Sequence, residues 1–273
     1  MFRLLFLGDI VGEPGRKAVM RSLPELRQNL NLDLIIVNGE NSAGGRGITP
    51  TIANKLFSSG ADVITTGDHV WDQKEILDYF PTQPNIIRPL NYPKESPGKG
   101  SVIIETPKGP IAIMNLQGNT FMNPPLANPF LEVEKELQRI ATHNVKMIFL
   151  DFHAETTSEK IAMGYHLDGH ISAMAGTHTH VQTADERILP NGTAHITDAG
   201  MCGPEHSVLG RNVESVLWRF KSSMPTRFPI ASGDVKLSGC IVEIDPSNGK
   251  AISITRYNEI VKPLSTGPDQ NPS

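Results

Sequence analysis

Short hydrophobic runs separated by polar clusters recur along the chain. Residues 4–7, 34–37 and 147–150 are continuous runs of Leu, Ile, Val, Phe and Met. Such runs are typical of parallel strands covered on both faces. Two less strictly apolar runs, at 62–65 and 171–175, predict two further strands, and helical spacing between the runs predicts units of strand, turn and helix.

The segments between these strands predict helices early in the chain and hairpins later. Residues 16–30 have helical spacing, which we expect Pro24 to divide in two. Asp72 and Glu75 resemble a capping box for a helix ending at Tyr79. Further helices are predicted at 49–60, 131–142, 157–167 and 213–220, and hairpins at 101–116, 187–197 and 238–256. We expect one domain over residues 1–264 and a disordered tail over 265–273.

Metal-ligand side chains follow each predicted parallel strand. In chain order they are Asp9, Glu40 with Asn41, Asp68 with His69, His153, and His178 with His180. Because the carboxyl ends of parallel strands meet at one edge of a sheet, we expect these side chains to share a site. Carboxylate, amide and imidazole ligands suit Mn, Fe(II), Co or Zn. There are enough of them for two divalent metal ions with one bridging carboxylate, an arrangement that serves phosphoryl transfer.

Composition narrows the range of partners and compartments. The formal net charge is −4, and the lysines and arginines form no basic stripe, so we expect a small phosphodiester substrate and no extended nucleic acid. Two cysteines, Cys202 and Cys240, imply no disulfide framework and fit a reducing compartment. The apolar start is too short for an export signal. We therefore expect a cytoplasmic protein with no membrane contact.

Five motifs cover nearly the whole chain: Gly8-Asp9, Asn38-Gly39-Glu40-Asn41, Gly67-Asp68-His69-Val70-Trp71, Asp151-Phe152-His153-Ala154-Glu155 and Gly176-Thr177-His178-Thr179-His180-Val181. In this order they resemble the calcineurin-like metallophosphoesterases, and more narrowly the bacterial 2′,3′-cyclic-nucleotide 2′-phosphodiesterases. The resemblance implies a four-layer α/β/β/α sandwich with two mixed central sheets and a dinuclear centre, usually of iron or manganese. It also suggests a homo-oligomer.

The same resemblance implies a role for each motif residue. One ion would be bound by Asp9, Glu40, Asn41 and His180, and the other by Glu40, Asp68, His153 and His178. His69 would be the general acid, which protonates the leaving 2′-oxygen as a bridging hydroxide attacks phosphorus. The expected reaction converts 2′,3′-cyclic nucleotides into 3′-nucleotides.

Two positions depart from the expected pattern. Val11 stands where the wider superfamily has a histidine ligand, and Asn41 is expected to replace that ligand. Asp68 stands where the subfamily usually has asparagine, and its extra negative charge favours tighter metal retention with weaker phosphate binding or slower turnover. Two alternatives stay open. A broad phosphomonoesterase or nuclease would use the same two-metal core, and Asp68 is consistent with a metal-binding regulatory protein with weak catalysis.

A few other residues have chemistry of interest but no support from the motifs. His143 and His195 are expected at the surface or in a hairpin. Cys202 is expected to be a small packing residue rather than a nucleophile. Arg46 lies in the glycine-rich segment after Glu40, where contact with an anionic substrate and full solvation are equally consistent with the sequence.

Overall fold

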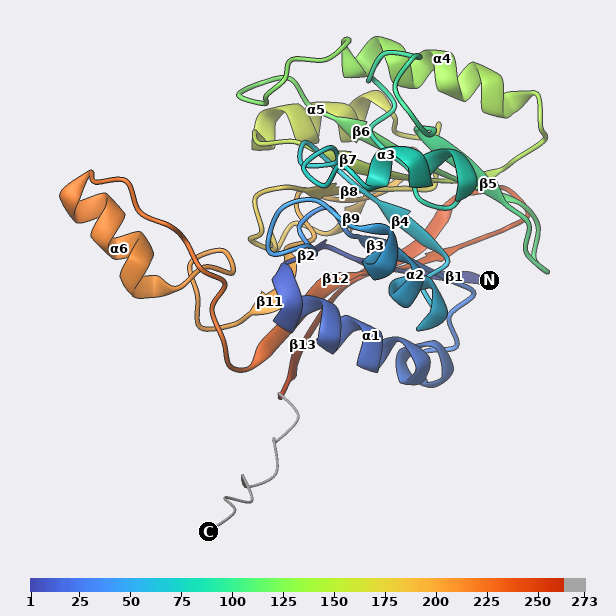
Figure 1. The fold of residues 1–273 in the computed structure, drawn as a ribbon. Helices are drawn as coiled ribbons and strands as arrows, with labels where there is room; N and C mark the ends of the chain where they lie inside the picture. Colours follow the sequence, from blue (N-terminus) through green and yellow to red (C-terminus); the bar gives the residue numbers. More distant parts are fainter. Residues whose placement is uncertain (263–273) are drawn as a thin grey trace.

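Two mixed β-sheets, with helices on their outer faces, form the body of the protein (Figure 1). The computed structural model describes residues 1–262, so the tail predicted at 265–273 lies outside the described residues. The predicted α/β sandwich with two mixed sheets is confirmed.

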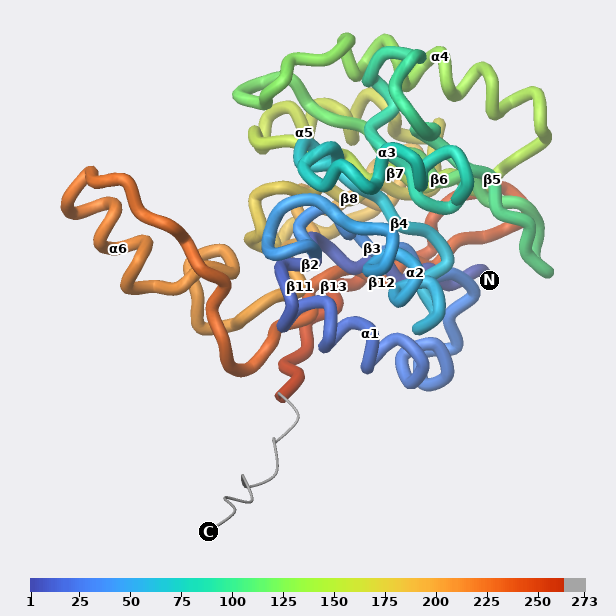
Figure 2. Tube along the Cα trace, in the orientation of Figure 1, coloured from blue at the N-terminus to red at the C-terminus, as the bar shows by residue number. Residues whose placement is uncertain are grey.

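The first sheet has seven strands in the order β2-β11-β12-β1-β3-β4, with β13 paired to β12. Its strands are β1 (Phe2–Leu7), β2 (Asp9–Ile10), β3 (Leu34–Asn38), β4 (Val63–Thr65), β11 (Met201–Pro204), β12 (Val235–Ile244) and β13 (Ala251–Val261). β1, β3 and β4 run parallel, and β12 lies antiparallel beside β1. Figure 2 shows how β12, from the last part of the chain, comes to lie beside β1 at its start.

The second sheet has six strands in the order β5-β6-β7-β8-β10-β9. They are β5 (Ser101–Ile104), β6 (Ile111–Gln117), β7 (Met147–His153), β8 (Ala173–Thr177), β9 (Arg187–Ile188) and β10 (Ala194–Ile196). The four central strands are parallel, and β5 and β9 are antiparallel edges. The three predicted hairpins are confirmed as β5–β6, β9–β10 and β12–β13.

The helices differ from the predicted ones in two places. They are α1 (Gly12–Asn29), α2 (Pro50–Ser58), α3 (Ile76–Tyr79), α4 (Pro129–Ala141), α5 (Thr157–His166) and α6 (Val213–Ser222), with a 3-10 turn at Phe80–Thr82. The predicted division of the first helix at Pro24 is wrong. Pro24 lies on the exposed face, while Leu23 and Leu26 beside it are buried, so packing carries the helix past the missing N–H. The predicted capping box is also wrong, because Asp72 pairs with Arg46 and α3 spans only one turn.

The core lies in three layers between these elements, which explains the continuous apolar runs. Phe2, Leu4 and Phe6 of β1 pack between the two sheets, where Phe6 meets Phe149 with ring centroids 5.0 Å apart. Leu5, on the other face of β1, packs with residues of α1 and α2. Each buried side chain of this kind contributes about 1.5–3 kcal/mol. Both faces of the strand are therefore buried, as its composition predicts.

Helix α6 stands away from the two sheets (Figure 1), and its Trp218 and Phe220 are exposed. The loop that leads to it returns to the sheets at Leu209, whose carbonyl lies 3.3 Å from Nδ1 of His180. Among the helices of residues 1–262, none is long and apolar enough to cross a membrane. Because of the contact between Leu209 and His180, the loop before α6 lies beside the predicted metal ligands, whereas α6 itself stands apart from the sheets.

Candidate metal centre

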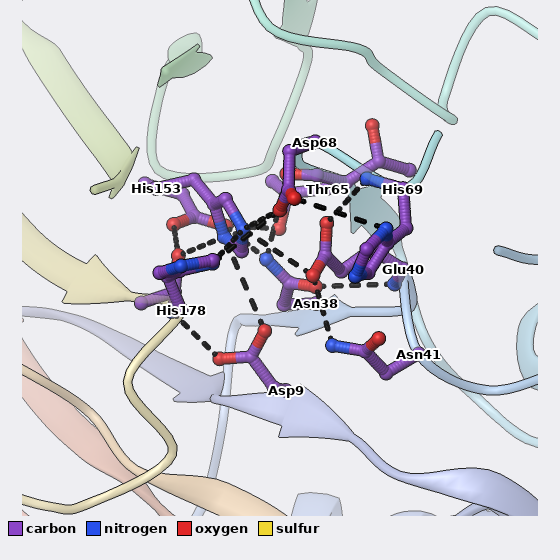
Figure 3. A network of polar contacts seen from close by, with 12 residues as sticks. Asp9, Asn38, Glu40, Asn41, Thr65, Asp68, His69, His153 and His178 are labelled. Atoms are coloured by element: carbon purple, nitrogen blue, oxygen red, sulfur yellow. Dashed lines mark hydrogen bonds and ion pairs between the residues drawn. The ribbon is translucent and has the colours of Figure 1, made fainter. Parts of the chain in front are cut away.

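The predicted ligands lie together where the parallel strands of both sheets end (Figure 3). Asp9 is in β2, Glu40 and Asn41 follow β3, and Asp68 follows β4. His153 is the last residue of β7, and His178 and His180 follow β8. The close approach requires glycine at position 67, because a Cβ there would lie 2.2 Å from Oε2 of Glu40. Side chains from five separate segments thus lie together where strands of the two sheets end.

Four of these side chains form a cluster with the spacing of a metal site. Glu40, Asp68, His153 and His178 each offer one ligand atom, and these atoms lie within 4.8 Å of one another. Nε2 of His153 is 3.0 Å from Oδ1 of Asp68 and 3.2 Å from Oε1 of Glu40. Nδ1 of His178 is 3.3 Å from the same Asp68 oxygen. This is the set that the resemblance assigns to one of the two ions.

The carboxylates and imidazoles of this cluster shift one another's pKa values. Burial opposes protonation of His153, but the Glu40 and Asp68 carboxylates outweigh it and hold the pKa of His153 well above its usual range. Burial likewise opposes ionisation of Asp68, and the contacts with His153 and His178 outweigh it and lower its pKa. A proton on Nε2 of His153 therefore neutralises carboxylate charge at the position where a metal cation would do the same.

The other predicted ligands adjoin this cluster. Nε2 of His180 lies 3.8 Å from Oδ1 of Asp9 and 3.2 Å from Nδ2 of Asn41. Nδ2 of Asn41 also donates to Oε1 of Glu40 at 2.8 Å. Asn41 would bind a cation through its Oδ1 atom. Its side-chain amide would therefore have to flip, because Nδ2 now faces the site. With Glu40 common to both groups, the residues form two adjoining ligand sets.

The residues fit a cation on two grounds. Oδ1 of Asp9 is buried and has no hydrogen-bond partner among the described residues, although burial makes an unsatisfied carboxylate oxygen costly. Burial also raises the pKa of Asp9. Among residues 1–262, the ion-pair contacts of Asp9, Glu40 and Asp68 are with histidines, and none is with lysine or arginine. A divalent ion would satisfy both the unpartnered oxygen and the excess of carboxylates.

A hydrogen-bond relay that the motifs did not indicate orients His153. Nδ1 of His153 lies 2.9 Å from Oγ1 of Thr177, which donates to Oδ1 of Asp151 at 2.6 Å. Nδ1 must then donate to Thr177, which leaves Nε2 as the ligand atom. Asp151 is two residues before His153 and so lies on the same face of β7. That spacing was a usable signal in the sequence.

His178 is held in a similar way by Glu155, which the sequence analysis also left without a role. Oε2 of Glu155 lies 3.1 Å from Nε2 of His178, so Nδ1 is the nitrogen that faces the cluster. Carboxylate partners of this kind fix the ring orientation of metal-binding histidines. Both histidines of the four-residue cluster therefore have a carboxylate behind them, reached through Thr177 in one case and directly in the other.

His69 lies at the rim of the cluster, where a quarter of its side chain is exposed. Its Nδ1 is 3.4 Å from Oδ2 of Asp72 and 3.5 Å from Nη2 of Arg46. Arg46 in turn binds Asp72 through Nε at 2.8 Å. Within the described chain, the polar contacts of the ring are thus at Nδ1, and Nε2 remains available for a substrate.

The structure separates the other candidates from the site. His143 is exposed, as expected, and His195 lies in the β9–β10 hairpin, as expected, although its side chain is buried and only 1% exposed. Neither ring nitrogen of His195 has a hydrogen-bond partner among the described residues, and burial lowers its pKa. Cys202 is fully buried, and burial raises its pKa to about 12, which confirms a packing role. Val11 is also buried and offers no ligand.

Sequence comparisons relate the chain to proteins named for phosphoester chemistry. The family model described as "YmdB-like protein" matches residues 5–257. A 2′,3′-cyclic-nucleotide 2′-phosphodiesterase of Bacillus subtilis is 49% identical over 254 residues, which cover 93% of this chain and 96% of that protein. The similarity therefore extends across both sheets and every predicted ligand.

Two solved structures have nearly the same fold. A phosphatase from Mycoplasma pneumoniae aligns with a TM-score of 0.89 at 35% identity, covering 95% of this chain and 93% of that one. A protein from Thermus thermophilus aligns with the same TM-score at 37% identity, covering 96% of this chain and all of that one. The two-sheet architecture is thus shared over nearly the full length of these two proteins.

Proposed function

The chain belongs to the family of YmdB-like proteins, and on that premise we propose that it is a metal-dependent phosphodiesterase that hydrolyses 2′,3′-cyclic nucleotides to 3′-nucleotides. One observation carries the proposal. The four ligand atoms of Glu40, Asp68, His153 and His178 lie within 4.8 Å of one another, beside a second set built from Asp9, Asn41 and His180. Two divalent ions, iron or manganese, are the cofactors that this donor set suits.

The ions would supply the Lewis acidity of the reaction, by activating water at neutral pH and by neutralising charge on the phosphoryl oxygens. Hydrolysis forms a bond from water oxygen to phosphorus and breaks the bond from phosphorus to the 2′-oxygen. The departing oxygen needs a proton, and His69 is placed to donate it from Nε2. In the protonated ring, the opposite nitrogen Nδ1 faces the carboxylate of Asp72, which Arg46 binds in turn, and this leaves Nε2 for the substrate.

Arg46 brings positive charge to the mouth of an otherwise acidic site. Its side chain is 64% exposed and lies beside His69. Arg211 donates to the carbonyl of Gly45 at 2.8 Å and so anchors the backbone next to Arg46. A guanidinium in this place would attract a phosphodiester anion without coordinating it. The same feature favours a small anionic substrate, since the chain as a whole carries a formal net charge of −4.

The proposal predicts a defined metal content and substrate preference. Protein purified without chelator should contain two divalent ions per chain and should release 3′-nucleotides from 2′,3′-cyclic nucleotides. Metal analysis and product chromatography measure this against 3′,5′-cyclic nucleotides and phosphomonoesters. A preference for monoesters would favour the broad phosphomonoesterase. Two bound ions with no turnover of any ester would favour a metal-binding regulatory protein.

A second prediction concerns Asp68, the carboxylate at a position where asparagine is usual. Two unit charges about 4 Å apart interact by about 4 kcal/mol at an effective dielectric constant of about 20. Relief of even part of this repulsion should lower the KM of Asp68→Asn for a cyclic nucleotide about tenfold. Because an amide is the weaker ligand, the variant should also lose metal faster on dialysis against a chelator.

Steady-state kinetics and metal analysis of the dialysed protein test both effects. Asp78→Asn is the control, since it removes the same charge from an exposed position in α3. Unchanged KM and unchanged metal retention in Asp68→Asn would show that the carboxylate has no influence on either.

A further inference from the structure

A fully buried ion pair lies beneath the two histidines that follow β8. Nζ of Lys160, in α5, is 2.6 Å from Oδ2 of Asp198, which follows β10. Lys160 is 0% exposed and Asp198 is 1% exposed. Buried charges are costly unless they are paired and hydrogen-bonded, so a pair in this position needs a structural explanation. None of the metal ligands proposed above requires it directly.

Asp198 holds the residue between the two histidines. Its Oδ2 accepts hydrogen bonds from Oγ1 of Thr179 at 2.7 Å and from the backbone N–H of Thr179 at 3.3 Å. His178 and His180 have φ angles of 95° and 66°, in the region that favours glycine. Backbone of this kind persists only where the surroundings hold it in place. The carboxylate of Asp198 therefore restrains the strained turn that presents both imidazoles.

The other oxygen of Asp198 extends the restraint to a third ligand. Oδ1 accepts a hydrogen bond from the backbone N–H of Gly200 at 2.8 Å, and the carbonyl of Gly200 accepts one from the backbone N–H of Asp9 at 3.2 Å. Oδ2 of Asp9 in turn accepts the backbone N–H of His178 at 3.1 Å. The carboxylate of Asp198 is thus part of a closed chain of hydrogen bonds that also includes Asp9 and the turn between His178 and His180.

The packing of Lys160 shows that the support is tightly fitted. A Cβ at Gly176 would lie 2.8 Å from Cδ of Lys160 and 1.9 Å from the carbonyl oxygen of Thr197. The end of β8 can therefore pass between Lys160 and the strand beside it only because position 176 is glycine. Lys160 supplies the counter-charge that keeps an ionised Asp198 tolerable in this interior.

We propose that Asp198, paired with Lys160, is a positioning residue that sets the ligand geometry of His178, His180 and Asp9. This role rests on the proposed two-metal site. The ion assigned to Asp9 and His180 depends on two ligands that Asp198 restrains. The ion assigned to Glu40, Asp68, His153 and His178 depends on one. Loss of Asp198 therefore weakens the first ion more than the second.

Manganese binding to metal-depleted protein tests this without relying on turnover. Hydrogen-bond partners of metal ligands typically contribute about 10–100-fold to metal affinity. Asp198→Asn should lose affinity on that scale for one of two Mn²⁺ ions in a calorimetric titration. It should also lose the electron paramagnetic resonance signal of a coupled Mn²⁺ pair at concentrations where the parent shows it.

Variants at position 179 separate the restraint from a general loss of stability. Thr179→Val removes the hydroxyl at nearly constant shape and should lower the affinity for the Mn²⁺ ion assigned to Asp9 and His180. Thr179→Ser keeps the hydroxyl and should bind both Mn²⁺ ions as the parent does. These substitutions leave the ion pair intact, so they report even if Asp198→Asn does not fold. Asp198→Asn alone leaves the buried ammonium of Lys160 without a counter-charge, and a double variant with Lys160→Met as well removes that ammonium. That double variant should regain melting temperature but not metal affinity.

Asp62→Asn is the matched control. Asp62 accepts hydrogen bonds from Arg27 and from the backbone N–H of Ile35, and it precedes β4 at the opposite end of that strand from the site. Its loss should lower the melting temperature alone. Parental affinity for both ions in Asp198→Asn and Thr179→Val would overturn the positioning role. Failure of the parent to bind two Mn²⁺ ions would instead overturn the two-metal site, and the inference with it.

Discussion

Glu40→Gln is expected to lose both metal ions and to lower kcat/KM on 2′,3′-cyclic nucleotides by about 10³-fold or more. Glu40 belongs to both proposed ligand sets, and it is 1% exposed with Oε1 3.2 Å from Nε2 of His153. Glutamine keeps the shape but removes the charge that two cations would share. Metal ions supply several kcal/mol of stabilisation to a phosphoryl transition state, and each 1.36 kcal/mol is tenfold in rate.

Metal analysis, initial rates and thermal unfolding together measure this effect. A bound ligand stabilises the folded state, so added Mn²⁺ should raise the melting temperature of the parent but not of Glu40→Gln. Glu243→Gln serves as the control, because Glu243 pairs with Arg3 at the far end of β1. Parental metal content in Glu40→Gln would remove Glu40 from the site, and full turnover without metal would refute the metal-dependent reaction.

His69→Ala is expected to keep both ions and to lose about 10²–10⁴-fold in kcat on 2′,3′-cyclic nucleotides, the usual contribution of general acid catalysis. The loss should depend on the leaving group. An alkoxide such as the 2′-oxygen needs a proton as it departs, whereas a nitrophenolate needs little help. The same variant should therefore lose much less activity on an activated nitrophenyl ester.

The comparison of two leaving groups distinguishes acid catalysis from a loss of binding or of metal. A variant with lost metal would be slow on both esters, and metal analysis would show it directly. His143→Ala, at an exposed position in the turn after α4, should match the parent on both. Full activity of His69→Ala on the cyclic nucleotide would exclude His69 as the acid.

Several parts of the fold were predictable because they depend on local pattern. The continuous apolar composition of β1, β3 and β7 indicated strands buried on both sides, and packing of the two sheets and their helices buries both faces. The hairpins followed from their turn residues. The predicted division of the first helix at Pro24 does not occur, because the burial of Leu23 and Leu26 against the sheet outweighs the local effect of proline.

The sequence alone placed Asp9, Glu40, Asp68, His153 and His178 at the ends of strands, since parallel strands in units of strand, turn and helix bring their carboxyl ends to one edge. The structure brings these side chains together. Their roles as ligands remain predictions, as does the role of His69. The resemblance to phosphodiesterases supplied the division of the ligands between two ions.

The partners of these side chains were decided only by tertiary structure. Asp72 appeared to be a helix cap, yet it holds His69 and Arg46, because the segment after β4 turns toward the glycine-rich segment instead of continuing as a helix. Lys160 and Asp198 are 38 residues apart and meet only when α5 packs under the end of β10. Local periodicity determines which face a residue occupies. Contacts between distant elements depend on how the two sheets and their helices pack, and the sequence pattern of one element carries no information about that.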